Sequence, residues 1–193
     1  MKAAAGHSRY SSVAIALHWI IGLIIIANLI GGLTLDYFLD SPDPAMKQLG
    51  FTIIGLHKSF GLTVILLTLA RIGWRIANPP PPLPAHMTRA EITLSKVSHY
   101  GFYVMMLAMP LSGWAMTSTG KVQYPLLYFG LFEVPKLPLP KSLGGLFRES
   151  HEIIGYLVIA TLALHIAAVI KHHYFDRDNI WARMSPFGGK DAA

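Results

Sequence analysis

The sequence predicts an all-α integral membrane protein in which four helices form an up-down bundle, and three observations lead to this prediction. Hydrophobic residues make up 53% of the 193 residues and charged residues only 13%, which leaves too much apolar surface for a soluble domain. Four segments are continuously apolar over the length that a hydrocarbon layer of about 30 Å requires. Their residues do not alternate between apolar and polar, as those of a membrane β-barrel would. We therefore expect a single transmembrane domain over residues 1–193.

The predicted helices are joined by connections of different kinds. The first apolar run is longer than the core of a signal peptide and lacks a cleavage pattern, so we interpret it as a retained helix. We expect a loop over residues 36–50, a stiff spacer or a partner-docking segment at the prolines 79–82, and an aromatic-rich loop over residues 118–150 that caps the bundle. The predicted helices span residues 13–35, 51–76, 97–117 and 151–171.

The distribution of basic residues predicts how the chain is oriented. Ten of the 16 Lys and Arg residues fall on the side of the two termini and six on the opposite, outer side. Because basic residues are enriched in cytoplasmic loops, we expect a multi-pass protein with both termini in the cytoplasm. The same bias accounts for the net charge of +6, so no nucleic-acid partner is expected.

Four histidines lie inside apolar segments, where a polar side chain often marks a functional site. In an up-down bundle, His18 and His165 fall at one depth, toward the termini, and His57 and His151 at another, toward the outer side. The 14 residues from His151 to His165 rise about 21 Å along one helix and return to within roughly 40° of the same face. Facing imidazoles from different helices can be the two axial ligands of a haem, so we predict two haems. Since the chain has no cysteine, each must be a haem b.

Each of these histidines also has a structural interpretation, because a single membrane histidine can simply donate a hydrogen bond between helices. The repeated match in depth favours haem. Zinc is less well supported, since carboxylate or thiolate partners are lacking and the two pairs are too far apart to share one ion. We expect the remaining histidines that lack a partner at their depth not to be ligands: His7, His86 and His99. Nearby glycines fit either the close approach of a flat macrocycle or close helix packing: Gly22, Gly55, Gly61 and Gly155.

Several stretches of the sequence resemble the bacterial cytochrome b561 family, and within it proteins of the superoxide oxidase type. They are Ala16-Leu17-His18-Trp19, Leu56-His57-Lys58, residues 151–156, 164–168 and 171–175, and the ending 178–184. The resemblance covers nearly the whole chain. It implies a four-helix protein of the bacterial inner membrane with two haem b groups, which takes electrons from superoxide and reduces ubiquinone. It also implies that His18, His57, His151 and His165 are the axial ligands, in agreement with the depth argument.

Other residues are candidates for binding rather than ligation. Arg71 and Arg75, one turn apart, can meet the propionates of the inner haem, or they can simply mark the membrane interface. Lys58 is the deepest cation on the outer side and can attract a small anionic donor or pair with a propionate. His172 follows His165 by seven residues and stays within about 20° of its face. It is the candidate neighbour of a quinone, or else an interfacial histidine that titrates in water.

Three hypotheses of function follow. The first is a free-standing oxidoreductase that passes electrons from superoxide, or another small donor, to the quinone pool. The second is a haem-b membrane anchor that relays electrons between a dehydrogenase subunit and quinone, and the third is a non-redox membrane protein. The short outer loops leave little surface for a partner subunit, which favours the first. Basic residues of the longest outer loop would steer superoxide: Lys121, Lys136, Lys141 and Arg148.

Overall fold

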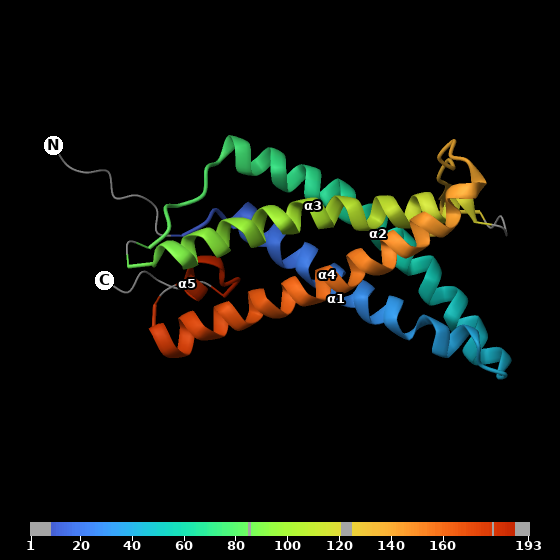
Figure 1. The fold of residues 1–193 in the computed structure, drawn as a ribbon, viewed down its shortest axis with the longest axis horizontal. Coiled ribbons are helices and arrows are strands. Elements are labelled where there is room, and N and C mark those ends of the chain that lie inside the picture. The colour runs from blue at the N-terminus through green and yellow to red at the C-terminus, as the bar shows by residue number, and fades with distance from the viewer. Residues whose placement is uncertain (1–8, 85, 121–124, 179, 188–193) are drawn as a thin grey trace.

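The computed structural model describes residues 9–84, 86–120, 125–178 and 180–187, and four long helices dominate its architecture (Figure 1). In chain order the elements are α1 (Ser12–Leu39), α2 (Pro44–Ala77), α3 (Arg89–Thr119), β1 (Leu127–Tyr128), β2 (Phe132–Glu133), the 3-10 turn η1 (Lys141–Leu143), α4 (Gly144–Ile170), the π-helix η2 (Lys171–Asp176) and the short α5 (Ile180–Met184). Lys121, expected to steer superoxide, and His7, expected not to be a ligand, lie outside the described residues.

All four long helices extend beyond the predicted apolar segments, and in α2 and α3 capping residues account for the earlier start. The carboxylate of Asp43 accepts a hydrogen bond from the Ala45 amide at 2.9 Å, and Pro44 occupies the first turn of α2. Thr88 and Glu91 form a capping box at the start of α3. The loop expected over residues 36–50 is therefore wrong: α1 continues to Leu39, and only residues 40–43 separate it from α2.

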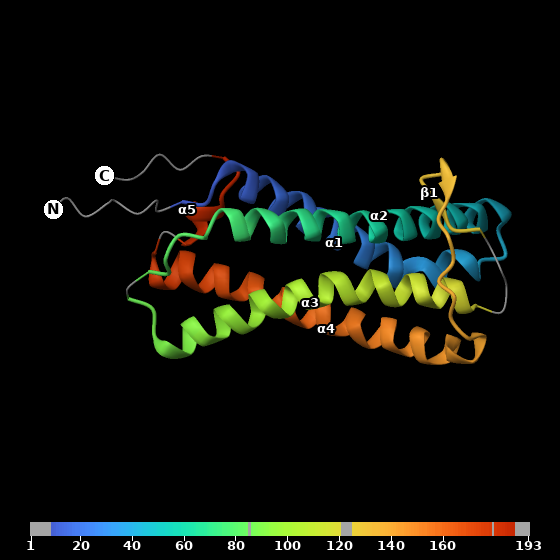
Figure 2. The same ribbon diagram turned by 90° about the horizontal axis from the view of Figure 1, so that it is seen from above.

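The long helices are arranged as two antiparallel pairs. Figure 2 shows α1 and α2 on one side and α3 and α4 on the other, with α2 packed against α3. The helix α5 lies at one end of the molecule, which we call the terminal end. The backbone amide of Tyr10 donates there to the carbonyl of Arg183 in α5. The β1–β2 hairpin and the turn between α1 and α2 lie at the other, the hairpin end. In the view of Figure 1 the two helix pairs cross near the middle of the molecule and lie apart toward both ends.

The helix surfaces are those of a membrane protein. Large apolar side chains are exposed along all four long helices, among them Ile20, Leu66, Val104 and Leu164. Three helical stretches in the described residues are long and apolar enough to cross a membrane: Ser12–Leu39, Pro44–Ala77 and Lys141–Asp176. The third predicted segment, now within α3, is not among these candidates, because aromatic and polar residues such as Tyr100, Tyr103 and Ser112 interrupt its apolar run. An all-α membrane fold is confirmed.

The long connection between α3 and α4 is fixed to α2 and α3. Its two short strands pair antiparallel, and the turn between them has a positive φ at Phe129 (49°) and Gly130 (74°). The hydroxyl of Ser59 on α2 donates to the carbonyl of Leu127 and accepts from the amide of Phe129, and Trp114 on α3 donates to the carbonyl of Pro135. Residues 125–143 of the connection thus form an ordered cover at the hairpin end.

Candidate functional site

Four histidines of the long helices meet in two pairs. At the terminal end, the ring centroids of His18 on α1 and His165 on α4 are 6.2 Å apart, with an angle of 68° between the rings. Toward the hairpin end, those of His57 on α2 and His151 on α4 are also 6.2 Å apart, at 76°. Antiparallel helices bring together residues that lie far apart in sequence but at the same depth. The partners are those expected from the sequence.

The separation within each pair suits a metal ion held between two imidazoles. Two metal–nitrogen bonds of about 2 Å in line, with a further 1.1 Å or so from each nitrogen to its ring centre, separate the centroids by about 6 Å. Around His57 and His151 the space is lined by apolar side chains, as a porphyrin ring requires. The lining includes Ile25, Leu29, Phe102, Met105, Met106 and Val158. The residues present therefore fit a haem with two histidine ligands.

Hydrogen bonds orient both imidazoles of the pair nearer the hairpin end. Nδ1 of His57 lies 3.1 Å from the carbonyl oxygen of Asn28, so the Nδ1–H group donates to it. The side-chain amide of Asn28 in turn donates to the backbone carbonyl of His57 at 3.2 Å. Nδ1 of His151 lies 3.0 Å from the carbonyl of Met109 and 3.1 Å from the hydroxyl of Ser112. In both rings this arrangement leaves the Nε2 lone pair available to a metal.

Two glycines that the sequence analysis did not single out make room for these imidazoles. A Cβ atom on Gly113 would lie 2.9 Å from Cε1 of His151, and one on Gly32 would lie 3.2 Å from Cε1 of His57. Of the four glycines expected beside a macrocycle or at close helix contacts, Gly22 and Gly55 face open space, whereas a Cβ on Gly155 would lie 3.4 Å from Cε of Met109 and one on Gly61 would lie 3.7 Å from Cβ of Pro110. Gly32 and Gly113 act from helices other than those of the histidines they touch, so sequence distance from a histidine could not reveal them.

The terminal end brings a third imidazole to the pair, which corrects an expectation. The ring centroid of His99 lies 6.3 Å from that of His165, although His99 was expected to have no partner at its depth. The expectation was wrong because α3 begins at Arg89 rather than at residue 97, which carries His99 two or more turns into the helix. Phe102 also packs edge-on against His165, at 5.6 Å.

Comparison with known proteins identifies the family. The family model described as prokaryotic cytochrome b561 matches residues 9–187. The chain belongs to this family. It is therefore a membrane electron-transfer cytochrome of a family that binds b-type haem.

Three relatives are similar over almost their whole length. "Cytochrome b561 homolog 2" of Escherichia coli (strain K12) is 28% identical, over 91% of this chain and 90% of the relative. "Cytochrome b561 homolog 1" of the same organism is also 28% identical, over 93% and 98%. "Probable superoxide oxidase CybB" of Yersinia pestis is 25% identical, over 93% and 97%.

The cytochrome carries two arginines beside the pair at the terminal end. Nε of Arg71 donates to the hydroxyl of Tyr103 at 3.3 Å, and the guanidinium of Arg75 lies 5.9 Å from the centre of the same ring. Arg71 is close enough to act electrostatically on His18 and His165. Within the described residues neither guanidinium pairs with a carboxylate of the protein. Both are available to an anionic group such as a propionate.

On α2, the cytochrome has a lysine that is the candidate for attracting an anionic electron donor. Lys58 is half-buried, directly follows His57 and acts electrostatically on that ring. No carboxylate in the described ranges pairs with Lys58. Lys141 and Arg148, from the loop expected to attract anions, are exposed.

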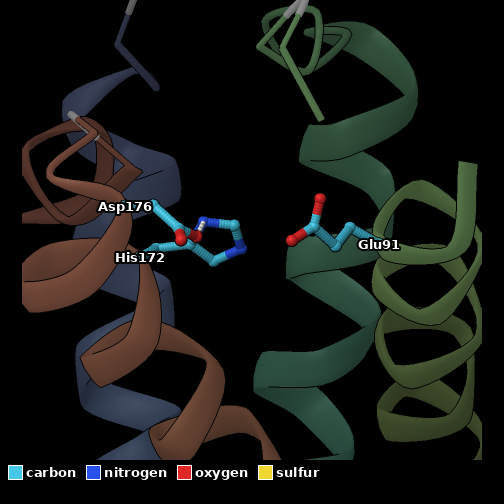
Figure 3. A group of neighbouring side chains, drawn as sticks. All are labelled: Glu91, His172 and Asp176. Atoms are coloured by element: carbon cyan, nitrogen blue, oxygen red, sulfur yellow. Dashed lines mark ion pairs between the residues drawn. The ribbon is translucent and has the colours of Figure 1, made fainter. Parts of the chain in front are cut away.

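His172, the candidate quinone neighbour, is buried in a cluster of charged side chains after α4 (Figure 3). Its Nδ1 atom lies 3.0 Å from Oδ2 of Asp176 and 2.8 Å from Oδ2 of Asp178. Figure 3 shows the carboxylate of Glu91 on α3 facing the same ring. The nitrogen and oxygen atoms of Glu91, His172 and Asp176 are close enough together to hold a metal ion. Lys171 already places its ammonium 2.8 Å from Glu91 and 2.6 Å from Asp176, so a cation of the protein fills this position.

Two carboxylates around His172, those of Glu91 and Asp178, are held in the charged state. The hydrogen bond from Lys171, followed by those from Thr88, lowers the pKa of Glu91 to about 2. Burial alone would raise the pKa of Asp178, but the Ile180 amide, His86 and His172 donate to this carboxylate and lower the pKa overall. The apolar pattern of the sequence does not reveal His86 and Asp178 as neighbours of His172, because only the chain reversal after α4 brings them there.

Proposed function

We propose that this chain is a di-haem cytochrome b that passes electrons from a small one-electron donor, superoxide, to ubiquinone. The observation that carries the proposal is the presence of two imidazole pairs with the same 6.2 Å separation, at two levels of one helix, α4. Fourteen residues separate the levels, which corresponds to about 21 Å along the helix. A haem bound at each level supplies a one-electron carrier. We assign His18 with His165, and His57 with His151, as the two ligand pairs.

We further propose that all four long helices cross the bacterial inner membrane, as one domain with both termini in the cytoplasm. Support comes from α3, which exposes Val97 and Val104 on its surface and packs against both α2 and α4. A helix so placed is difficult to accommodate outside the membrane that its neighbours cross. The excess of basic residues on the terminal side supports the cytoplasmic position of that end.

The remaining candidate residues have roles at the two ends of this path. At the periplasmic hairpin end, Lys58 offers an uncompensated positive charge that attracts superoxide. At the terminal end, Arg71 and Arg75 hold the propionates of the inner haem. His172 lies beside the quinone and supplies a proton to it. Two superoxide ions give up one electron each and leave as dioxygen, and one ubiquinone takes two electrons and two protons to become ubiquinol.

A redox experiment on the purified, haem-loaded chain tests the proposal. Superoxide as the sole reductant should reduce both haems, and added ubiquinone should reoxidise them while ubiquinol accumulates. His57→Ala should remove one haem of the two and stop electron entry, whereas His173→Ala, at an exposed histidine, should do neither. If superoxide does not reduce the haems but a co-purified dehydrogenase does, the chain is instead a membrane anchor of that dehydrogenase.

A further inference from the structure

One carboxylate after α4 links a buried imidazole to an imidazole in contact with water. Oδ2 of Asp178 lies 2.8 Å from Nδ1 of His172 and 3.1 Å from Nε2 of His86. The side chain of His86 is 58% exposed, whereas those of Asp178 and His172 are 7% and 11% exposed. The three groups therefore form an unbroken row from the surface to the interior.

The backbone after α4 is folded so that Asp178 returns to His172. The helix widens to a π-helix over Lys171–Asp176, and Arg177 ends it in the left-handed conformation, with φ of 53°. The amides of Arg177 and Asp178 both donate to the carbonyl of His172. Oδ1 of Asp178 accepts the amide of Ile180 at 3.1 Å and so caps α5. This bond fixes the carboxylate and leaves Oδ2 to the two imidazoles.

The other charged groups around His172 pair with one another, while Asp178 interacts with the imidazoles of His172 and His86. Asp176 also contacts Nδ1 of His172, but it is paired with Lys171, which also pairs with Glu91 across the gap to α3. Nε2 of His172 forms no hydrogen bond in the part of the chain that the structure describes. On the other side, a pocket open to water reaches His86 and Asp178. Arg177 and Arg183 are the cations that line it.

We propose that His86, Asp178 and His172 form a proton-delivery line from water to a quinone bound beside His172. This inference rests on the proposed reduction of quinone. A structural ion pair between Asp178 and a histidine would need only one imidazole. Here Oδ2 of Asp178 is shared by two imidazoles, and the second of them, that of His86, is exposed. Such a chain of hydrogen bonds carries a proton inward when its inner end gives one up.

His172, with a proton on each ring nitrogen, gives its Nε2–H proton to a quinone oxygen as the quinone takes an electron, and it keeps the Nδ1–H that it donates to Asp178. A flip of the ring then turns the vacant nitrogen toward Asp178, which passes to it a proton from His86, and water reprotonates His86. Two such cycles and two electrons from the haem sites convert one quinone to one quinol.

A first experiment measures proton delivery during quinone reduction. Full-length haem-loaded protein is reduced with dithionite, freed of excess reductant and mixed with a short-chain ubiquinone in a stopped-flow instrument. Asp178→Asn and His86→Ala should slow haem reoxidation about tenfold or more, most strongly at alkaline pH, because general acid catalysis is lost. Free imidazole should restore the rate of His86→Ala. His173→Ala, one position from His172 but exposed, is the matched control and should react like the wild type.

A second experiment does not depend on quinone. Nitrogen-15 NMR of the histidine rings reports how fast the His172 ring proton exchanges with water, and this exchange should slow in His86→Ala and Asp178→Asn and recover with imidazole. Wild-type rates in both variants, or a loss in His86→Ala that imidazole does not restore, would overturn the proton line. If the wild type fails to reduce quinone while the exchange behaves as expected, the proposed acceptor is wrong and the proton line stands.

Discussion

Substitution of Gly113 by alanine tests whether the imidazole of His151 holds a haem in the position that the structure gives it. The new Cβ would lie 2.9 Å from Cε1 and 3.2 Å from Nδ1 of the ring. Ordinary carbon contacts begin near about 3.5 Å, so the ring must move by roughly half an ångström. It cannot move freely, because Met109 and Ser112 on the same helix hold its Nδ1 atom.

The expected loss follows from the size of this clash. Overpacking by one methyl group costs about 1–3 kcal/mol. If that strain is relieved only when the imidazole leaves its ligand position, haem affinity at this level falls by roughly 5- to 150-fold. Alanine also favours a helix over glycine by up to about 1 kcal/mol. The apoprotein of Gly113→Ala should therefore keep its thermal stability or come close to it, while haem binding weakens.

The assay counts haem per chain in membranes and in purified protein, and follows the low-spin signals of the two sites by electron paramagnetic resonance. We expect Gly113→Ala to lose the signal of the His57–His151 site and to keep that of His18–His165. Gly73→Ala is the control, since nothing lies within 4 Å of its built Cβ. If Gly113→Ala retains two haems with the affinity and spectra of Gly73→Ala, the placement of His151 as a ligand is refuted.

Three further predictions concern residues around the site. Ser112→Ala leaves His151 bonded to a carbonyl only, so both haems should remain while the potential of one shifts in a redox titration; loss of that haem would contradict this. Asn28→Leu removes one amide hydrogen bond between α1 and α2 and should lower the free energy of unfolding by about 1 kcal/mol without loss of haem, measured by thermal melting with a haem count. Because the pKa of Glu91 is lowered from 4.5 to about 2, its stabilising contribution is complete above about pH 4.5 and disappears as the pH falls toward 2. The melting temperature of Glu91→Gln should thus lie below that of the wild type at pH 7, with the difference shrinking below pH 4.5; a difference independent of pH would contradict this.

The sequence predicts the histidine pairs because their geometry depends only on regular helices. Alternating helix direction and a constant rise per residue bring His18 to the depth of His165 and His57 to that of His151, and both pairs lie together in the structure. Their role as haem ligands remains a prediction. The polar side chain of Asn28 within an apolar segment could also have indicated a contact with a histidine, since it bonds from α1 to His57 on α2.

Other features depend on local caps and on contacts between distant segments. The true start of α3 follows from the capping box of Thr88 and Glu91, which the apolar pattern ignores, and the depth of His99 changed with it. Gly113 matters only because α3 passes against His151 on α4. Asp178 reaches His172 through a π-helical turn and a left-handed Arg177, and the hydrophobic periodicity of the sequence predicts neither of them.

The two imidazole pairs lie in different electrostatic settings, and the difference favours one direction of electron flow. At the hairpin end, both imidazoles donate Nδ1–H to carbonyl oxygens, which would make them stronger donors to the iron of a haem bound as proposed and would stabilise its oxidised state. At the terminal end, the charge of Arg71 acts on both His18 and His165 and favours the state with one more electron. The haem at the terminal end should therefore have the higher potential. In the proposed path, electrons that enter beside Lys58 would then move downhill toward the terminal end, where the proposed proton line reaches His172.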